Sequence, residues 1–224
     1  MTEPTPHFHR PEDNETASTW NRVAADYETR IGSLTIYQPG YDRFLGQIQV
    51  PGARILDVGC GPGTIAGYLL KMRPDLSVLG TDYAPAMVSL ASQRVPGARF
   101  QVMDIRHIGT LQERFHGVMG GFCLPYLSPE DGKRLIRDSF DLLLPDGLFY
   151  LSLVEGNPER SGFQSNKRGD RVYFYYYQAE VISDWMLEAG FEKPDLQSLH
   201  WERPGSGTET HQILLTRKPA SQMP

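Results

Sequence analysis

Apolar residues recur along the chain in two rhythms, and the change between them divides it into segments. From residue 16 they fall three or four positions apart, the spacing of one helix face. These residues are Trp20, Val23, Ala24, Tyr27 and Ile31. A second short helix is expected from Pro39, which completes an N-terminal helical cap over 16–50. Residues 1–15 are rich in proline, histidine and charge, and we expect them to form a disordered tail.

Short apolar runs and helix patterns then alternate. Strands are expected at 53–58, 77–82, 98–103, 115–123 and 147–154, and helices at 64–72, 85–94 and 129–143. Apolar runs between helices of this length are typical of parallel strands that are buried on both faces. Right-handed crossovers between such strands predict an α/β fold, a doubly wound sheet with helices on both sides.

The alternation breaks after the fifth strand. Residues 155–177 form a long connection, and a helix is expected over 179–189, closed by Gly190. Two final strands are expected at 191–201 and 210–218. The main domain is therefore predicted over 51–218, with 155–177 as an insertion.

Composition narrows the classes of protein. The 224 residues are 40% hydrophobic and carry a net charge of −5, which suits one core and argues against nucleic acid as a partner. No signal segment or membrane-length apolar run is visible, so we expect a cytoplasmic monomer or homodimer with no membrane partner. Cys60 and Cys123 lie in apolar stretches and are expected to be reduced packing thiols; their spacing indicates no metal site.

The stretch ILDVGCGPG, residues 55–63, places three glycines directly after the first strand. Glycine lets the backbone turn tightly and approach a ligand, and the next helix begins there with free N–H groups. Gly59, Gly61 and Gly63 therefore predict a nucleotide-like ligand at this edge of the sheet. The G-x-G-x-x-G spacing of dinucleotide sites is not met, because Thr64 stands at its third position. A tight turn without a ligand remains the alternative for this stretch alone.

Carboxylates end the next two strands. Asp82 is placed to accept hydrogen bonds from a ribose diol, and Asp104 from an adenine amine while Ile105 packs on the ring. A single aspartate at such a position is more often a turn or a helix cap. With Asp57, however, each of the first three expected strands has an aspartate at or near its carboxyl end.

The sequence resembles the class I S-adenosylmethionine-dependent methyltransferases, in their small-molecule branch. The motifs that carry this resemblance are LDVGCGPG, GTDYAPAMV, FQVMDI and LLLPDGLFYLSLV, with WNRVAADY and WMLEAGFE as weaker matches within 16–218. The resemblance implies S-adenosylmethionine as cofactor and a seven-stranded sheet in the order 3-2-1-4-5-7-6 with the last strand antiparallel.

The same resemblance assigns roles to single residues. Gly59 and Gly61 would approach the methionine part of the cofactor, and Phe122 would lie near the sulfonium. Asp82 would take the ribose hydroxyls, and Asp104 with Ile105 the adenine. The other residues expected in the cofactor site are Tyr27, Asp57, Cys60, Tyr83 and Met87.

Methyl transfer depends mainly on alignment, so no catalytic side chain is required by the pattern. Two candidates are Tyr126, which would orient the substrate or serve as a structural tyrosine, and Glu155, which would face the crevice or a surface turn. No decisive base is visible.

The insertion 155–177 is predicted to act as a lid over the acceptor. Its stretch RVYFYYY is expected to place Tyr173 and Tyr175 on one side of an extended segment, and Arg171 adds positive charge. Together with Tyr126 these residues predict a small acceptor that is aromatic or anionic. The alternative is a hairpin that packs its aromatic rings on the sheet.

The leading hypothesis is methyl transfer to a small-molecule acceptor. A non-catalytic regulatory protein that binds an adenosyl ligand is the alternative, because binding and catalysis share these motifs. A nicotinamide oxidoreductase is disfavoured by Thr64 and by the second acidic position at Asp104.

Overall fold

The computed structural model describes residues 10–31, 35–166, 168–203 and 207–220. Helix α1 (Pro11–Ile31) is described as backbone throughout, whereas its side chains after Ala24 lie outside the described residues. The predicted site residue Tyr27 is among these. Within the described ranges, no helix is both long and apolar enough to cross a membrane.

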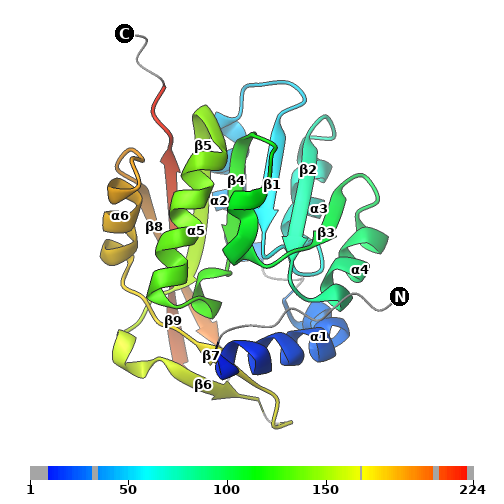
Figure 1. Cartoon of the computed structure of the whole chain (residues 1–224), viewed down its shortest axis with the longest axis vertical. Coiled ribbons are helices and arrows are strands. Elements are labelled where there is room, and N and C mark those ends of the chain that lie inside the picture. The colour runs from blue at the N-terminus through cyan, green and yellow to red at the C-terminus, as the bar shows by residue number, and fades with distance from the viewer. Residues whose placement is uncertain (1–9, 32–34, 167, 204–206, 221–224) are drawn as a thin grey trace.

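Seven strands form one twisted sheet through the centre of the molecule (Figure 1). They are β1 (Arg54–Val58), β2 (Ser77–Asp82), β3 (Arg99–Val102), β4 (Phe115–Gly121), β5 (Leu143–Val154), β8 (Asp195–Arg203) and β9 (Gly207–Arg217). Their order is β3-β2-β1-β4-β5-β9-β8, and β9 is antiparallel to both neighbours. The predicted doubly wound sheet is confirmed. Since β6 and β7 lie outside this sheet, the predicted order 3-2-1-4-5-7-6 is the one observed.

Helices cover both faces of the sheet (Figure 1). They are α2 (Gln38–Gln47), α3 (Thr64–Met72), α4 (Pro85–Arg94), α5 (Pro129–Leu142) and α6 (Ala179–Glu188). Short 3-10 turns occur as η1 (Thr35–Tyr37), η2 (Ile105–Thr110), η3 (Leu124–Tyr126) and η4 (Pro158–Arg160). The predicted helices at 64–72 and 85–94 coincide with α3 and α4.

The core has two layers because successive strand residues point to opposite faces. Ile55 and Met119 pack with Phe44 of α2 in one cluster of buried residues. Leu56 and Val118 pack with the apolar side chains of α5 and α6 in the other. This double burial explains why the strands read as continuous apolar runs.

The disordered tail expected over 1–15 is wrong for residues 11–15, which already belong to α1. Proline is favoured in the first turn of a helix, and Glu12 and Asp13 complement the helix dipole there. Asp13 and Thr16 are also buried, so tertiary contacts hold this first turn. The polar composition of residues 11–15 favoured a disordered tail, but polar side chains in the first turns of α1 form contacts with other segments, such as that of Asp13 with Arg106.

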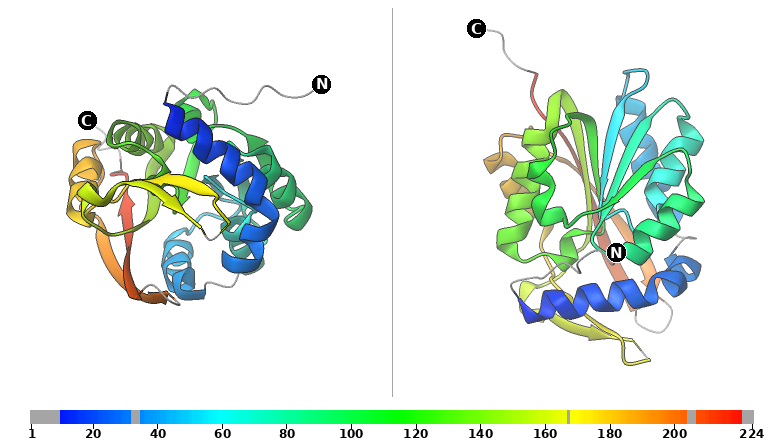
Figure 2. Two further views of the ribbon diagram at one scale, coloured as in Figure 1. Left: turned by 90° about the horizontal axis from the view of Figure 1, so that it is seen from below. Right: turned by 45° about the vertical axis from the view of Figure 1, so that its right-hand side comes forward.

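The insertion 155–177 contains η4 and a two-stranded hairpin, β6 (Gly162–Ser165) and β7 (Arg171–Phe174). The hairpin runs along α1, and both cross the carboxyl ends of the parallel strands (Figure 2). Thr16 Oγ1 accepts from the Tyr173 amide at 2.9 Å, and Thr19 Oγ1 donates to the Arg171 carbonyl at 2.9 Å. Helix α1 and the hairpin are thus bonded into one cap.

Candidate cofactor site

The glycine turn lies between β1 and α3. Gly59, Gly61 and Gly63 have φ values of +66°, +51° and +81°, a region that other residues rarely adopt. At Gly59 a Cβ would also lie 2.9 Å from the Cβ of Cys123. Around Gly61 nothing lies within 4 Å of such an atom, so this backbone faces open space. The turn therefore exposes main chain at the edge of the sheet.

Asp82 ties the end of β2 to this turn. Its Oδ2 accepts from the Gly61 amide at 3.0 Å, and its Oδ1 accepts from the Ala84 amide at 2.9 Å. Burial raises the pKa of Asp82 to about 6, although these two amides oppose the shift. The carboxylate is held rigidly, with lone pairs left over for a ligand.

Asp104 follows β3 and caps η2. It accepts from the Arg106 amide at 2.9 Å and from Arg106 Nη1 at 2.8 Å. Arg106 also pairs with Asp13 of α1 at 3.2 Å and with Asp131 of α5 at 3.4 Å. Three carboxylates from three segments therefore converge on one largely buried guanidinium.

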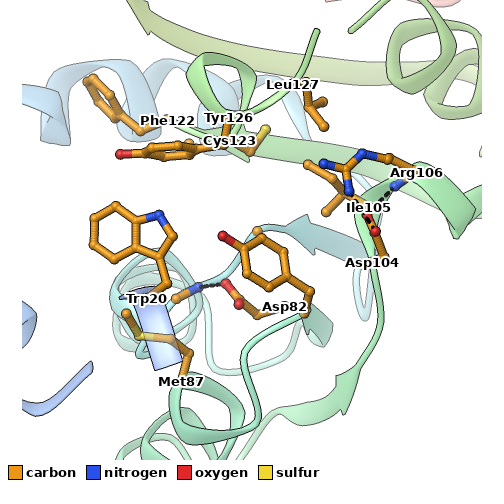
Figure 3. Close-up of a pocket in the computed structure, with 14 residues that line it drawn as sticks. Trp20, Asp82, Met87, Asp104, Ile105, Arg106, Phe122, Cys123, Tyr126 and Leu127 are labelled. Carbon is orange, nitrogen blue, oxygen red and sulfur yellow. Dashed lines mark hydrogen bonds and ion pairs between the residues drawn. The ribbon is translucent and has the colours of Figure 1, made fainter. Parts of the chain in front are cut away.

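A pocket opens at the carboxyl ends of the central strands, and Trp20 of α1 is among the residues that line it (Figure 3). The ring of Trp20 meets that of Tyr126 edge-on, with 5.3 Å between centroids. The predicted residues that line the pocket are Gly59, Gly61, Asp82, Tyr83, Met87, Asp104, Ile105, Phe122 and Tyr126. Sequence reasoning thus selected residues from separate segments that the fold brings together.

Two further cofactor predictions, Asp57 and Cys60, do not line this pocket. Asp57 is fully buried. Burial raises its pKa to about 8 and the nearby Asp82 carboxylate adds to the rise, whereas a backbone hydrogen bond from Ala66 opposes it. Cys60 is a buried free thiol whose pKa is raised by burial, as is that of Cys123. Cys60 therefore packs in the interior, whereas Cys123, although buried, is among the residues that line the pocket.

The predicted substrate residues of the insertion do not line the pocket either. Arg171 is exposed, forms an ion pair with Glu15 of α1 and stacks on Phe163. Tyr173 packs against Tyr175, whose hydroxyl accepts from Arg10 at 3.4 Å. These residues bind the cap together because α1 extends further towards the N-terminus than the sequence indicated.

Glu155 is also away from the pocket lining. It accepts from Gln212 Nε2 at 2.6 Å and from the Ala179 amide at 3.4 Å. These bonds join the end of β5 to β9 and to the first turn of α6. Of the two catalytic candidates, only Tyr126 lies at the pocket.

Sequence reasoning missed four residues of the lining and placed Trp20 only as a residue of the cap. The four are Arg106, Gly121, Cys123, which was expected only as a packing thiol, and Leu127. The signal for Arg106 was its position two residues after Asp104. Its partners Asp13 and Asp131 come from distant segments, so no local pattern predicts that it is buried.

Known proteins show what the chain resembles. Residues 55–147 match the family described as methyltransferase domain. Trans-aconitate 2-methyltransferase of Variovorax paradoxus is 30% identical over 116 residues, which are 51% of this chain and 44% of that protein. The ubiquinone biosynthesis O-methyltransferase of Coxiella burnetii is 22% identical over 207 residues, 84% of this chain and 86% of that protein.

Among solved structures, the Burkholderia thailandensis 1,6-didemethyltoxoflavin-N1-methyltransferase shares the fold. It has a TM-score of 0.71 at 20% identity and covers 98% of this chain and 93% of its own. The present chain spans 40–44% of the length of curated relatives that are 30–34% identical to it. Together these matches confirm the resemblance to class I S-adenosylmethionine-dependent methyltransferases. S-adenosylmethionine is the cofactor of this class.

Proposed function

We propose that the chain is an enzyme that transfers a methyl group from S-adenosylmethionine to a small-molecule acceptor. The observation that carries the proposal is the bond between the Gly61 amide and Asp82, at a pocket that Trp20 also lines. The glycine turn lets a ligand approach the main chain closely, and the Asp82 carboxylate beside it provides oxygens that accept hydrogen bonds. An adenosyl ligand needs both features in one place.

The residues present fit this cofactor. The glycine turn leaves open space beside Gly61, which lines the pocket, and the buried carboxylates Asp82 and Asp104 line the same pocket. A ligand that carries a sulfonium and an ammonium group would offset the charge of Asp57 and Asp82, whose burial disfavours their ionised forms. Asp82 would hold the ribose hydroxyls, and Asp104 with Ile105 the adenine.

S-adenosylmethionine supplies an activated methyl carbon, so the task of the protein is alignment. Orientation of two bound reactants is worth roughly 7–11 kcal/mol in well-aligned systems. In this chain Trp20 and Tyr126 line the pocket with their rings in contact, and with the ligands bound they would help to exclude water. Phe122, at the end of β4, would confine the reacting end of the cofactor.

The acceptor is proposed to be planar or apolar rather than anionic. The rings of Trp20 and Tyr126 offer flat contact surfaces at the pocket. Arg106 is engaged by three carboxylates, and Arg171 by Glu15. An anionic acceptor would have to compete with these carboxylates for either guanidinium.

Labelled methyl transfer tests the proposal. The full chain is incubated with methyl-labelled S-adenosylmethionine and a mixture of small molecules extracted from cells. We expect label in a small molecule and equimolar S-adenosylhomocysteine. Tight binding of S-adenosylhomocysteine with no transfer would favour the regulatory alternative. Neither binding nor transfer would contradict both.

A further inference from the structure

Beside Phe122, on the side of the sheet that carries α2, three polar side chains form a connected row. The Tyr37 hydroxyl is hydrogen-bonded to His211 Nδ1, and His211 Nε2 lies 3.3 Å from the Glu209 carboxylate. Tyr37 ends η1, whereas His211 and Glu209 belong to β9. Residues separated by most of the chain length are therefore brought together in one row.

This row is buried beside the candidate cofactor site. Tyr37 is 4% exposed and His211 is 2% exposed. The ring of Phe122, which lines the pocket, lies 4.8 Å from that of Tyr37 and 5.4 Å from that of His211 between centroids. Trp201 of β8 packs on the imidazole from the other direction. The row is thus one aromatic ring away from the pocket.

The two contacts are compatible with one tautomer of the neutral imidazole. With Glu209 as the acceptor, we assign the ring proton to Nε2. Nδ1 then carries a lone pair and accepts the Tyr37 O–H. A base oriented by a carboxylate and bonded to a hydroxyl is the arrangement that activates such hydroxyls for proton transfer.

We propose that Tyr37, with His211 and Glu209 behind it, accepts the proton of a hydroxyl-bearing acceptor during methyl transfer. The inference rests on the proposed function. As the acceptor oxygen bonds to the methyl carbon, the carbon–sulfur bond breaks and its electron pair stays on sulfur. The acceptor proton passes to the Tyr37 oxygen while the Tyr37 proton passes to His211 Nδ1. The resulting imidazolium is stabilised by Glu209.

This role selects a class of acceptor. A phenol or catechol loses a proton when its oxygen is methylated, so a base assists the reaction. A carboxylate has no proton to lose and would gain nothing from the row. The inferred substrate is therefore a hydroxyl compound. Because Tyr37 is not among the residues that line the pocket, the acceptor oxygen would meet the Tyr37 hydroxyl past the edge of the Phe122 ring. His211 and Glu209 act through Tyr37 as positioning residues.

The test uses the full chain with labelled S-adenosylmethionine and three probes: catechol and 4-methylphenol, which bear phenolic hydroxyls and no carboxylate, and trans-aconitate as a carboxylate. The variants are Tyr37→Phe, His211→Gln and Glu209→Gln. Matched controls are Tyr68→Phe, whose exposed hydroxyl bonds Asp42, and His200→Gln on the outer strand β8. Binding of S-adenosylhomocysteine is measured for every variant, which reports whether the cofactor site has folded.

We expect the parent to methylate a phenolic probe. Tyr37→Phe and His211→Gln should lower kcat by at least about 100-fold, with KM and S-adenosylhomocysteine affinity changed by less than about threefold. The kcat of Glu209→Gln should lie between the values of these two variants and that of the parent. The kcat of both control variants should equal that of the parent. A purely structural role would alter affinity and leave kcat unaffected.

Two results would overturn the inference while leaving the proposed function in place. One is transfer by the parent to trans-aconitate alone. The other is parental kcat for the phenolic probes in Tyr37→Phe and His211→Gln. If the parent binds no S-adenosylhomocysteine, or transfers methyl to no acceptor, the proposed function has failed and the inference falls with it.

Discussion

Asp57 is a carboxylate side chain that is fully buried in the folded protein. A backbone hydrogen bond from Ala66 offsets only part of the cost of that burial. Burial raises the pKa of Asp57 to about 8, against about 4 for an exposed aspartate. Its ionised form therefore costs folding free energy.

The pH dependence of stability follows from this shift. Between about pH 4 and pH 8 the folded chain holds a proton at Asp57 that the unfolded chain has lost, so stability falls as the pH rises. In Asp57→Asn this contribution disappears. The difference in unfolding free energy between variant and parent should grow by about 1 kcal/mol per pH unit over that range.

Urea unfolding of both proteins at pH 5, 6 and 7 measures this difference. Asp184→Asn, an exposed change on α6, serves as the control and should give a constant offset. A constant offset for Asp57→Asn as well would show that Asp57 is ionised in the folded chain throughout.

Among the elements, α1 is held to the main domain by a buried charge cluster. Asp13 lies 3.2 Å from Arg106, which also holds Asp104 at the pocket. On the same helix, Glu12 is only partly buried. The docking of the cap is thus connected, through one guanidinium, to a residue predicted to contact the cofactor.

We predict that Asp13→Asn loosens α1 while the rest of the fold persists. A hydrogen bond to a charged group contributes about 1.5–3 kcal/mol, so amide hydrogen exchange in α1 should accelerate by at least about tenfold. In the control variant Glu12→Gln, the amide hydrogens of α1 should exchange at the same rate as in the parent. Equal protection of α1 in Asp13→Asn and the parent would show that Arg106 does not fasten the cap.

At the scale of the whole molecule, the sequence was sufficient for the sheet and for most of the pocket. The doubly wound sheet and the edge that carries Asp82, Asp104 and the glycine turn follow from local rules, whereas the strand order and the antiparallel β9 were implied by the resemblance to class I methyltransferases. An apolar run must be buried, parallel strands need crossovers, and ligand groups gather at the carboxyl ends of strands. Each of these rules applies within one short segment.

What could not be predicted depends on contacts between distant segments. The first turn of α1 is polar, and its burial becomes visible only when Arg106 is placed beside Asp13. Arg171 was expected to face a substrate, yet it pairs with Glu15, which was assigned to the tail. The row of Tyr37, His211 and Glu209 gave no local signal, because β9 alone supplies only two of its three members.

The central claim is that the glycine turn and Asp82 form the site of an adenosyl cofactor. Calorimetric titration of the full chain with S-adenosylhomocysteine tests it most directly. We expect one site per chain, an affinity at least about tenfold lower in Asp82→Asn through loss of a charged hydrogen-bond acceptor, and parental affinity in Asp184→Asn. Absence of binding, or equal binding by Asp82→Asn and the parent, would contradict the account.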